Sequence, residues 1–279
     1  MPGTLYVVAT PIGNLADLSR RGADVLGCVA MIAAEDTRRT RVLLDHLGVA
    51  GTPVVALHSH NETAVSGGVL QRLEAGDSVA LVSDAGTPLL SDPGFELVRA
   101  CWSAGVPVIP VPGPSAVAAV LSVCPLPAHR FLFEGFLPAK AAARVERLRA
   151  LLAGDVAAVF FEAPHRMTAT LDDLEALDPA RRLMVGREMT KQHEQYLCDR
   201  PAALRERLAG ADQFRGEFVC VLEAGAALAD DRSVRSTMET LCRELPPAQA
   251  ARLGAQLLGR SRRQLYDLAL TLKPPADGA

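Results

Sequence analysis

Two aspartates mark the loop whose residue types are most informative about chemistry. The segment LVSDAGTPLLSDPG, residues 81–94, begins as an apolar run and breaks into a loop with two glycines, two prolines, Asp84 and Asp92. Glycine lets a backbone approach a ligand closely, as in phosphate-binding loops. This segment has no lysine or arginine, however, and its carboxylates disfavour a phosphate. We therefore expect Asp84 to face a cation or a hydrogen-bond donor, or else to cap a turn, whereas Asp92 is expected to cap the following helix.

A cofactor without phosphate would suit this loop. S-adenosylmethionine carries a sulfonium, an ammonium group, ribose hydroxyls and an adenine, but no phosphate. The sequence contains neither the GxxxxGK[ST] pattern of a P-loop nor GxGxxG after its first strand-like run. These observations favour S-adenosylmethionine over a nucleotide as the ligand.

If such a cofactor donates its methyl group to a hydroxyl, the transfer depends on orientation and on removal of the hydroxyl proton. Orientation can supply roughly 7–11 kcal/mol, and a base contributes about 10²–10⁴-fold in rate. The candidate bases are Glu35 and Asp36 at the end of the second strand-like run, His60 at the end of the third, and Lys191.

Lys191 and the histidines have competing interpretations. Lys191 could contact the substrate or lower the pKa of its hydroxyl, and it could equally be the ion-pair partner of Glu188 or Glu194. His58 and His60 are two positions apart, so a strand would point them to the same face. Because no third ligand follows at a suitable spacing, we expect no metal site and a structural role for His58.

The elements that must position these residues alternate between strand and helix. Strand-like segments at residues 4–10, 30–37, 53–62, 78–84 and 107–115 alternate with helical patterns, which predicts a parallel sheet covered by helices. Ligands bind beyond the carboxyl ends of such strands, where the polar loops lie.

Farther along the chain, five more strand-like runs with helices between them predict a second α/β domain with a mixed sheet. An all-helical tail follows. We expect an α/β protein with an N-terminal domain at 1–126, a second domain at 127–226 and a helical tail at 227–279.

Composition narrows the class of protein. The chain has 279 residues, a net charge of −3 and 49% hydrophobic residues, so a large core is available and an overall basic field is absent. Its six cysteines form no CxxC pair, which is typical of buried thiols in a reducing compartment. No signal-like segment or membrane-length apolar run is present, and we expect a cytoplasmic protein.

Ten motifs in order along the chain cover nearly all of it and are LYVVATPIGNLADLSRR, AEDTRRTRVLL, HSHNE, LVSDAGTPLLSDPG, PVPGPSA, FEGFLPAK, FFEAPHR, REMTKQHE, GEFV and SRRQLYDLAL. Together these motifs resemble the tetrapyrrole-methylase-like (class III) methyltransferases, and within them the branch that methylates a cytidine 2'-oxygen of 16S ribosomal RNA. Ser59 is a departure, since an acidic residue is expected between the two histidines.

The resemblance implies a fold of two α/β domains with S-adenosylmethionine in the cleft between them. The residues implied in cofactor binding are Pro11, Gly13, Asp84, Ala85, Gly86, Thr87, Ser115, Ala116, Phe161, Glu162, Ala163, Gly216 and Glu217.

The resemblance also implies a folded RNA as substrate, in the decoding region of 16S ribosomal RNA and within the 30S subunit. The candidate RNA contacts, beside a hydrogen bond from His60, are Arg38, Asn61, His165, Arg166, Arg260, Arg262 and Arg263. His165 and Arg166 could instead brace the domains. The three tail arginines stand at a helix start, where they oppose the helix dipole, so either RNA phosphate or a solvated turn explains them.

The same resemblance suggests a homodimer, for which the apolar helix at residues 115–124 is a candidate interface. Two alternatives remain. A small-molecule methylase of the same fold would need no basic tail, and a non-catalytic ribosome-assembly factor would bind RNA without using the cofactor.

Overall fold

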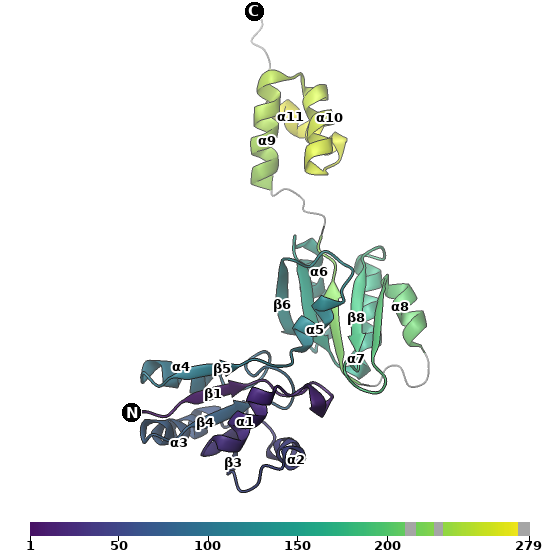
Figure 1. Ribbon diagram of the computed structural model, residues 1–279. Coiled ribbons are helices and arrows are strands. Elements are labelled where there is room, and N and C mark those ends of the chain that lie inside the picture. The colour runs from purple at the N-terminus through teal and green to yellow at the C-terminus, as the bar shows by residue number, and fades with distance from the viewer. Residues whose placement is uncertain (210–215, 226–230, 273–279) are drawn as a thin grey trace, which may run out of the picture.

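The computed structural model describes residues 1–209, 216–225 and 231–272 and contains two five-stranded sheets followed by a group of three helices (Figure 1). We call the first sheet with its covering helices the first unit, the second sheet with its helices the second unit, and the three last helices the helical unit. This architecture confirms the expected fold class.

The first sheet is entirely parallel and follows the order β3-β2-β4-β1-β5. Its short strands are rich in Val, Ala, Ile and Leu, as expected for strands covered on both faces. They are β1 (Leu5–Val8), β2 (Met31–Ala34), β3 (Val54–Ala56), β4 (Val79–Val82) and β5 (Val108–Val111).

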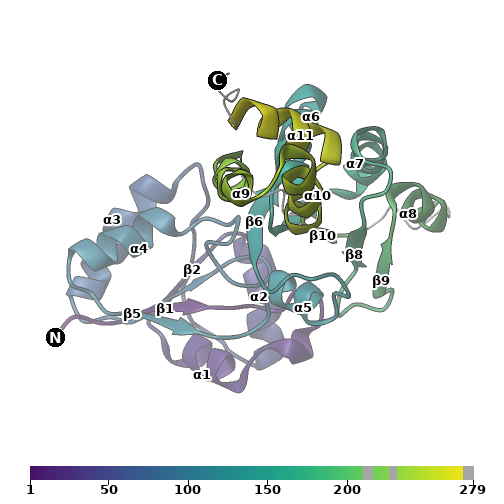
Figure 2. The ribbon, with the colours of Figure 1, turned by 90° about the horizontal axis from the view of Figure 1, so that it is seen from above.

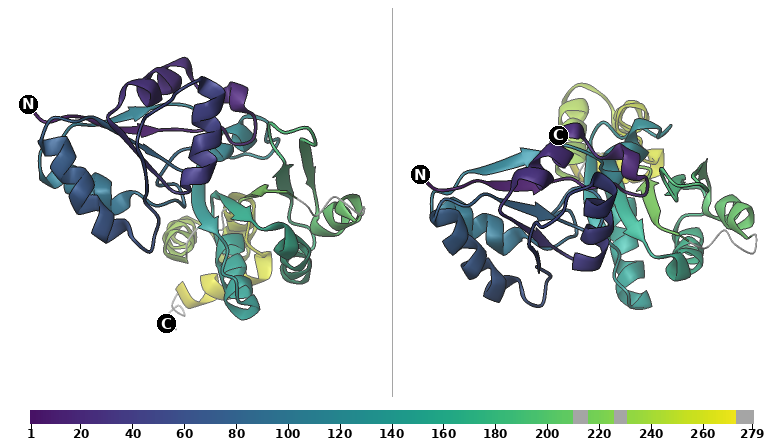
Figure 3. Two further views of the ribbon diagram at one scale, coloured as in Figure 1. Left: turned by 90° about the horizontal axis from the view of Figure 1, so that it is seen from below. Right: turned by 60° about the horizontal axis from the view of Figure 1, so that its bottom comes forward.

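Helices cover both faces of the first sheet (Figures 2 and 3). One core lies under α3 (Glu62–Glu74) and α4 (Phe95–Ser103), and the other lies under α1 (Arg20–Cys28) and α2 (Thr37–Leu47). A short 3-10 helix, η1 (Leu15–Asp17), follows β1. Since every strand is parallel, the loops after β1, β2, β4 and β5 open at one edge of the sheet.

The second sheet is mixed, in the order β6-β7-β10-β8-β9, with only β6 and β7 parallel. Its strands are β6 (Phe131–Phe136), β7 (Ala157–Glu162), β8 (Leu183–Arg187), β9 (Gln195–Asp199) and β10 (Phe218–Leu222). One face packs against α6 (Ala141–Ala153), α7 (Pro164–Leu177) and α8 (Pro201–Leu208).

The other face of the second sheet is covered by α5 (Ala116–Ser122), which follows the last strand of the first unit. Val117 and Val120 are buried there together with Val159, Met184 and Val219. The expectation that this helix offers an apolar dimer interface is therefore wrong, because its apolar stripe is already covered within the chain.

The helical unit consists of α9 (Asp231–Glu244), α10 (Pro247–Leu258) and α11 (Arg262–Leu272), which pack around Met238 and Leu265. The helix α10 ends at Gly259, whose left-handed backbone turns the chain into α11. Figure 1 shows these helices standing apart from both sheets. Among the residues described, no helix combines the length and apolar character needed to cross a membrane.

Candidate functional site

A cavity of about 420 Å³ lies between the two units, at the carboxyl-end edge of the first sheet. Loops after β1, β2, β4 and β5 line one side, and β6 with the ends of β7, β8 and β10 lines the other. The lining residues are Ile12, Glu35, Arg39, Asp84, Ala85, Gly86, Thr87, Leu90, Ser91, Asp92, Ser115, Ala116, Val117, Phe136, Phe161, Glu162, Ala163, Pro164, Met189, Glu217, Phe218 and Val219. The structure thus brings together eleven of the sequence-predicted site residues, which are Glu35, Asp84, Ala85, Gly86, Thr87, Ser115, Ala116, Phe161, Glu162, Ala163 and Glu217.

Two carboxylates link the ends of β2 and β4 through hydrogen bonds. Glu35 Oε2 accepts a hydrogen bond of 3.1 Å from the Asp84 backbone N–H, and Asp84 Oδ1 accepts one of 3.0 Å from the Asp36 backbone N–H. The next turn is closed by Gly86, which forms two backbone hydrogen bonds with Thr10. The backbone φ of Gly86 is 80°. Glycine suits this left-handed backbone, so the loop can lie close to a ligand.

Asp36 does not line the cavity. Its carboxylate caps α2 by accepting from the Arg38 backbone N–H at 2.8 Å, and it also pairs with the Arg38 guanidinium at 2.7 Å. The Arg38 side chain, through its hydrogen bond first of all, holds the pKa of Asp36 well below its usual range. A carboxylate with so low a pKa is a poor base.

Arg39, rather than Arg38, lines the cavity. Its Nη1 lies 3.4 Å from Asp84 Oδ2, and its side chain is largely exposed at the cavity rim. Sequence analysis missed this residue because two neighbouring arginines at a helix start point in different directions, and only the three-dimensional course of α2 shows which one turns inward.

Asp92 also lines the cavity, and its expected role as a helix cap is wrong. The helix α4 begins only at Phe95, and the carboxylate of Glu62 on α3 accepts from the N–H groups of Gly94 and Glu96. Burial, reinforced by the charges of Glu35 and Asp84, raises the pKa of Asp92 to about 6.

The wall contributed by the second unit is largely apolar. Phe161 lines the cavity and makes edge-to-face contacts with Phe133 and Phe136, with ring centroids 5.2 and 5.5 Å apart. Met189 and Val219 extend this surface. A flat apolar ring could pack on this wall of the cavity, and the carboxylates lie on the opposite wall.

Glu162 is buried at the end of β7 and organises the turn into α7. One carboxylate oxygen accepts from Thr170 Oγ1 at 2.7 Å, and the other lies 3.1 Å from Arg166 Nε. Arg166 also donates to the carbonyls of Leu137 and Pro138. These contacts of Arg166 all lie within the second unit, so they stabilise the turn into α7 and do not supply the expected brace between the two domains.

Lys191 forms ion pairs with Glu188 at 3.0 Å and Glu217 at 3.3 Å. Although burial acts to lower it, these carboxylates raise the pKa of the Lys191 ammonium. A base must be deprotonated, so the geometry favours the ion-pair role. Glu194, the other predicted partner, instead accepts from Thr190 N and Tyr196 Oη.

Two close contacts between the units flank the cavity, and we call them the two clasps. In one, a Cβ on Gly135 of β6 would lie 2.8 Å from Ser91 Oγ, and in the other a Cβ on Gly13 would lie 2.5 Å from Lys191 Cγ. Each clasp therefore joins a glycine of one unit to a loop of the other. The described non-glycine residues with left-handed backbone fall in these same two loops and are Leu89, Ser91, Glu188 and Thr190. Such strain persists only where its surroundings enforce it, and it is enriched at functional sites.

The remaining predicted residues lie outside the cavity lining. His60 is exposed beyond edge strand β3, and Asn61 closes a local turn by accepting from His58 N and donating to Ala56 O. The others are Pro11, Gly13, Gly216, His165, Arg260, Arg262 and Arg263. Across the described parts of the chain, no group of three or more His, Cys, Asp or Glu side chains could hold a metal ion.

The sequence of this chain is similar to two protein families and to several relatives of known name. Residues 4–203 match the family model of the Tetrapyrrole (Corrin/Porphyrin) Methylases, and residues 226–273 match that of the RsmI C-terminal HTH domain. Ribosomal RNA small subunit methyltransferase I of Xylella fastidiosa (strain Temecula1 / ATCC 700964) is 49% identical over 270 residues, covering 95% of this chain and 98% of that protein. The protein of that name from Pseudomonas aeruginosa is 44% identical and covers 96% and 97%. This chain belongs to the ribosomal RNA small subunit methyltransferase I family.

Solved structures place this family in a wider fold. Diphthine synthase superposes with a TM-score of 0.61 at 18% identity, over 80% of this chain and 90% of that one. Uroporphyrin-III C-methyl transferase from Thermus thermophilus, complexed with S-adenyl homocysteine, gives 0.55 at 20% identity, over 79% and 97%. The ribosomal RNA small subunit methyltransferase I family thus shares the tetrapyrrole methylase fold.

Proposed function

We propose that this chain transfers the methyl group of S-adenosylmethionine to the 2'-oxygen of a cytidine in the decoding region of 16S ribosomal RNA. The observation that carries the proposal is the cavity between the two units, with carboxylates on one side and an apolar aromatic wall on the other. Membership of a family of methyltransferases, together with the motifs of its RNA branch, supports the substrate class.

The residues of the cavity fit S-adenosylmethionine. Glu35 and Asp84 place two carboxylates at the cavity, and Arg39 pairs with Asp84 at the rim. A ligand with positive sulfonium and ammonium groups and no phosphate balances that charge. Phe161 and Met189 offer the apolar surface on which an adenine would pack.

When bound, the cofactor supplies a methyl group already activated for transfer. The work left to the protein is to bind both reactants, hold the ribose oxygen in line with the methyl group and exclude water, and orientation alone can supply roughly 7–11 kcal/mol. The left-handed Ser91 and Thr190 fix the two loops that flank the cavity, and so they support this positioning role.

Arginines outside the acidic part of the cavity are suited to the RNA. Arg39 lies at the cavity rim, and Arg262 and Arg263 are exposed at the start of α11 in the helical unit. Phosphate contacts of this kind give affinity that falls with salt. We infer that the helical unit holds the RNA while the cavity receives the target nucleotide, within the 30S subunit.

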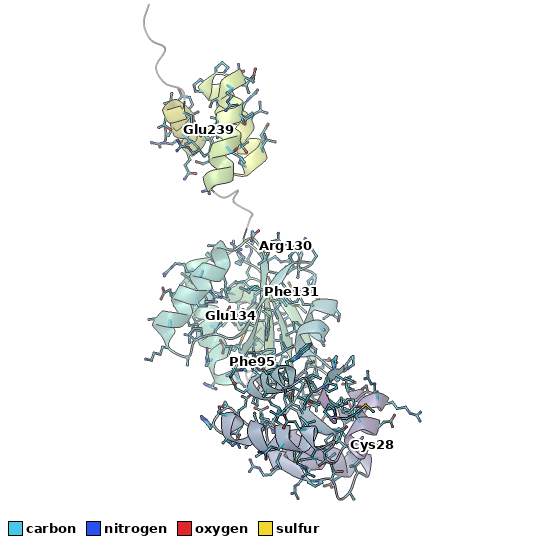
Figure 4. All side chains as sticks on the ribbon, turned by 90° about the vertical axis from the view of Figure 1, so that its left-hand side faces the viewer. Cys28, Phe95, Arg130, Phe131, Glu134 and Glu239 are labelled. Carbon is cyan, nitrogen blue, oxygen red and sulfur yellow. The ribbon has the colours of Figure 1, made fainter. Side chains whose placement is uncertain are left out.

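We also propose that the protein is cytoplasmic and forms a homodimer. Phe95 and Phe131 are 60% and 45% exposed, and Figure 4 shows them on the same side of the molecule. A contact with a second copy would cover exposed apolar side chains such as these. Light scattering over a range of protein concentrations tests this, and a monomeric mass throughout would refute it.

The decisive test combines methyl transfer with mapping of the product. Purified protein is incubated with labelled S-adenosylmethionine and either naked 16S RNA or 30S subunits, and mass spectrometry locates the methyl group. We expect a methyl on one cytidine ribose. A methyl on a base refutes the 2'-O assignment, and the absence of cofactor binding in calorimetry leaves only an RNA-binding role.

A further inference from the structure

We propose that Asp92 is the catalytic base that receives the proton of the target hydroxyl, and that Ser83 is the positioning residue that orients its carboxylate. This inference rests on the proposed function, because it concerns the same cavity and the same transfer. It assigns a role to a residue whose sequence context, just before a proline and a helix, indicates only a cap.

The other carboxylates near the strand ends are committed to structure. Glu35 accepts from the Asp84 backbone, and Asp84 accepts from the Asp36 backbone and pairs with Arg39. Asp36 itself caps α2 and binds Arg38 outside the cavity lining. Protonation of Glu35 or Asp84 would weaken contacts that hold the ends of β2 and β4 together, and protonation of Asp36 would weaken the cap of α2.

Asp92 is differently placed. It lines the cavity and is half-buried. The hydroxyl of Ser83, a residue only 4% exposed, lies close enough to lower the pKa of Asp92 by hydrogen bonding, and it also lies 3.5 Å from the Ala85 carbonyl oxygen. The carboxylate therefore keeps acceptor capacity for a ligand in the cavity. No backbone element depends on its charge, since α4 is capped by Glu62.

The backbone around Asp92 holds it toward the cavity. Leu89 and Ser91 have φ values of 73°, a conformation that costs a non-glycine residue energy and is retained only under constraint. The constraint is visible in one of the two clasps, where Ser91 lies against Gly135 of β6. Asp92 is thus fixed beside the second unit rather than left on a free loop.

The charge surroundings suit a base. Burial raises the pKa of Asp92 to about 6, with help from Glu35 and Asp84, while the Ser83 hydrogen bond acts in the opposite direction. The other charged groups that line the cavity are Arg39 on the first unit and Glu162 and Glu217 on the second. A carboxylate of this pKa accepts a proton more readily than an ordinary aspartate and is still ionised near pH 7.

The transfer balances without another reactant. A lone pair of the ribose 2'-oxygen forms the bond to the methyl carbon, and the carbon–sulfur bond breaks with its electron pair remaining on sulfur, which becomes a neutral thioether. The hydroxyl proton passes to a carboxylate oxygen of Asp92 late in this step. The protonated Asp92 then releases its proton to water after the product leaves.

The test is Asp92→Asn in the full-length protein, measured by single-turnover methylation of the RNA substrate across pH 5–8. We expect the wild-type rate to rise with pH through a midpoint near 6. The variant should be slower by about 100-fold or more and lose that dependence. Asp24→Asn on the exposed surface of α1 is the matched control and should behave as wild type. Calorimetry with S-adenosylhomocysteine should give the same affinity for wild type and Asp92→Asn.

Ser83→Ala provides an independent readout. Loss of its hydrogen bond removes an interaction that lowers the pKa of Asp92, so the midpoint of the pH–rate profile should move upward. A merely structural role for Ser83 would change the rate without moving the midpoint, and this variant keeps the test valid if Asp92→Asn fails to fold.

Two results would overturn the inference while leaving the proposed function intact. One is an Asp92→Asn variant that methylates the ribose at the wild-type rate. The other is a variant that no longer binds S-adenosylhomocysteine, which would make Asp92 a cofactor ligand. If the wild type itself places no methyl on a ribose, the proposed function fails instead.

Discussion

At the scale of single residues, similar side chains lie side by side but have different roles. Asp36 caps a helix whereas Glu35, one position earlier, lines the cavity, and Arg38 neutralises Asp36 whereas Arg39 reaches the cavity rim. Residue type alone does not separate the members of such pairs. What separates them is the direction each side chain takes as the strand turns into the helix.

The raised pKa of Asp92 predicts how stability depends on pH. Its pKa is about 6 in the folded protein and near 3.8 in the unfolded chain, so the folded state binds the proton more tightly and loses stability as pH rises from about 4 to 6. Asp92→Asn removes this loss. Partial exposure limits the effect, and we expect the variant to gain ~1 kcal/mol over wild type at pH 7 and nothing at pH 4.

Urea denaturation at several pH values measures this difference. The Asp24→Asn variant provides the control, since it removes a carboxylate from the exposed surface. A gain for Asp92→Asn that is equal at pH 4 and pH 7 would show that the folded protein does not raise the pKa of Asp92.

Arg39 and Arg38 form a matched pair for RNA binding. Arg39→Ala should weaken RNA binding several-fold at low salt, because its guanidinium lies at the cavity rim beside Asp84. Arg38→Ala should have a smaller effect, since that guanidinium is paired with Asp36. Filter binding with cofactor-saturated protein measures both, and equal losses would contradict the assignment.

At the scale of elements, the two clasps determine how closely the units approach. Gly135 lies directly against Ser91 of the other unit, so that an added Cβ would contact Ser91 Oγ. The backbone φ of Gly135 is 72°. Both the strained loops and the glycines opposite them are needed for this approach. The geometry of the cavity therefore depends on residues that carry no functional group.

Gly135→Ala tests this dependence, with Gly48→Ala as the control. Both positions have φ near 70°, so each substitution should destabilise the fold by about 1 kcal/mol through backbone strain. A Cβ at Gly48 meets open space, whereas one at Gly135 meets Ser91. Only Gly135→Ala should weaken S-adenosylhomocysteine binding in calorimetry, and an equal effect of both would exclude a role for this clasp.

Much of this architecture follows from local sequence, and the exceptions have long-range causes. The ten strands and the polar loops at their ends are predictable because alternating apolar runs and turn residues specify them locally. Asp92 was misassigned because α4 starts at Phe95 and takes its cap from Glu62, thirty-two residues before Gly94. Burial of the apolar face of α5 on the second sheet depends likewise on tertiary contacts that periodicity does not reveal.

At the scale of the whole molecule, charge is divided between regions. The cavity is lined by more carboxylates than guanidiniums, while the start of α11 exposes Arg262 and Arg263. With a net charge of only −3, the molecule as a whole neither attracts nor repels RNA strongly. Local patches must therefore provide the attraction.

The double variant Arg262→Ala/Arg263→Ala tests the contribution of the helical unit. If both contact phosphates, RNA affinity should fall and the slope of log affinity against log salt should lessen by about 1–2. Cofactor affinity should not change, because the cavity lies in the two sheet-containing units. Arg235→Ala on α9, which breaks an exposed pair with Glu239, should leave the salt slope as it is. If the double variant keeps the wild-type salt slope, Arg262 and Arg263 do not contact RNA phosphates.

The placement of α5 has a consequence for cutting the chain. Val117 and Val120 follow the first sheet in sequence but are buried against the second. If the backbone is opened between Ser122 and Phe131, the N-terminal fragment keeps an apolar helix that only the C-terminal fragment can cover. The two fragments, expressed separately and mixed, should therefore associate and reconstitute the protein, because α5 of the N-terminal fragment packs on the sheet of the C-terminal fragment.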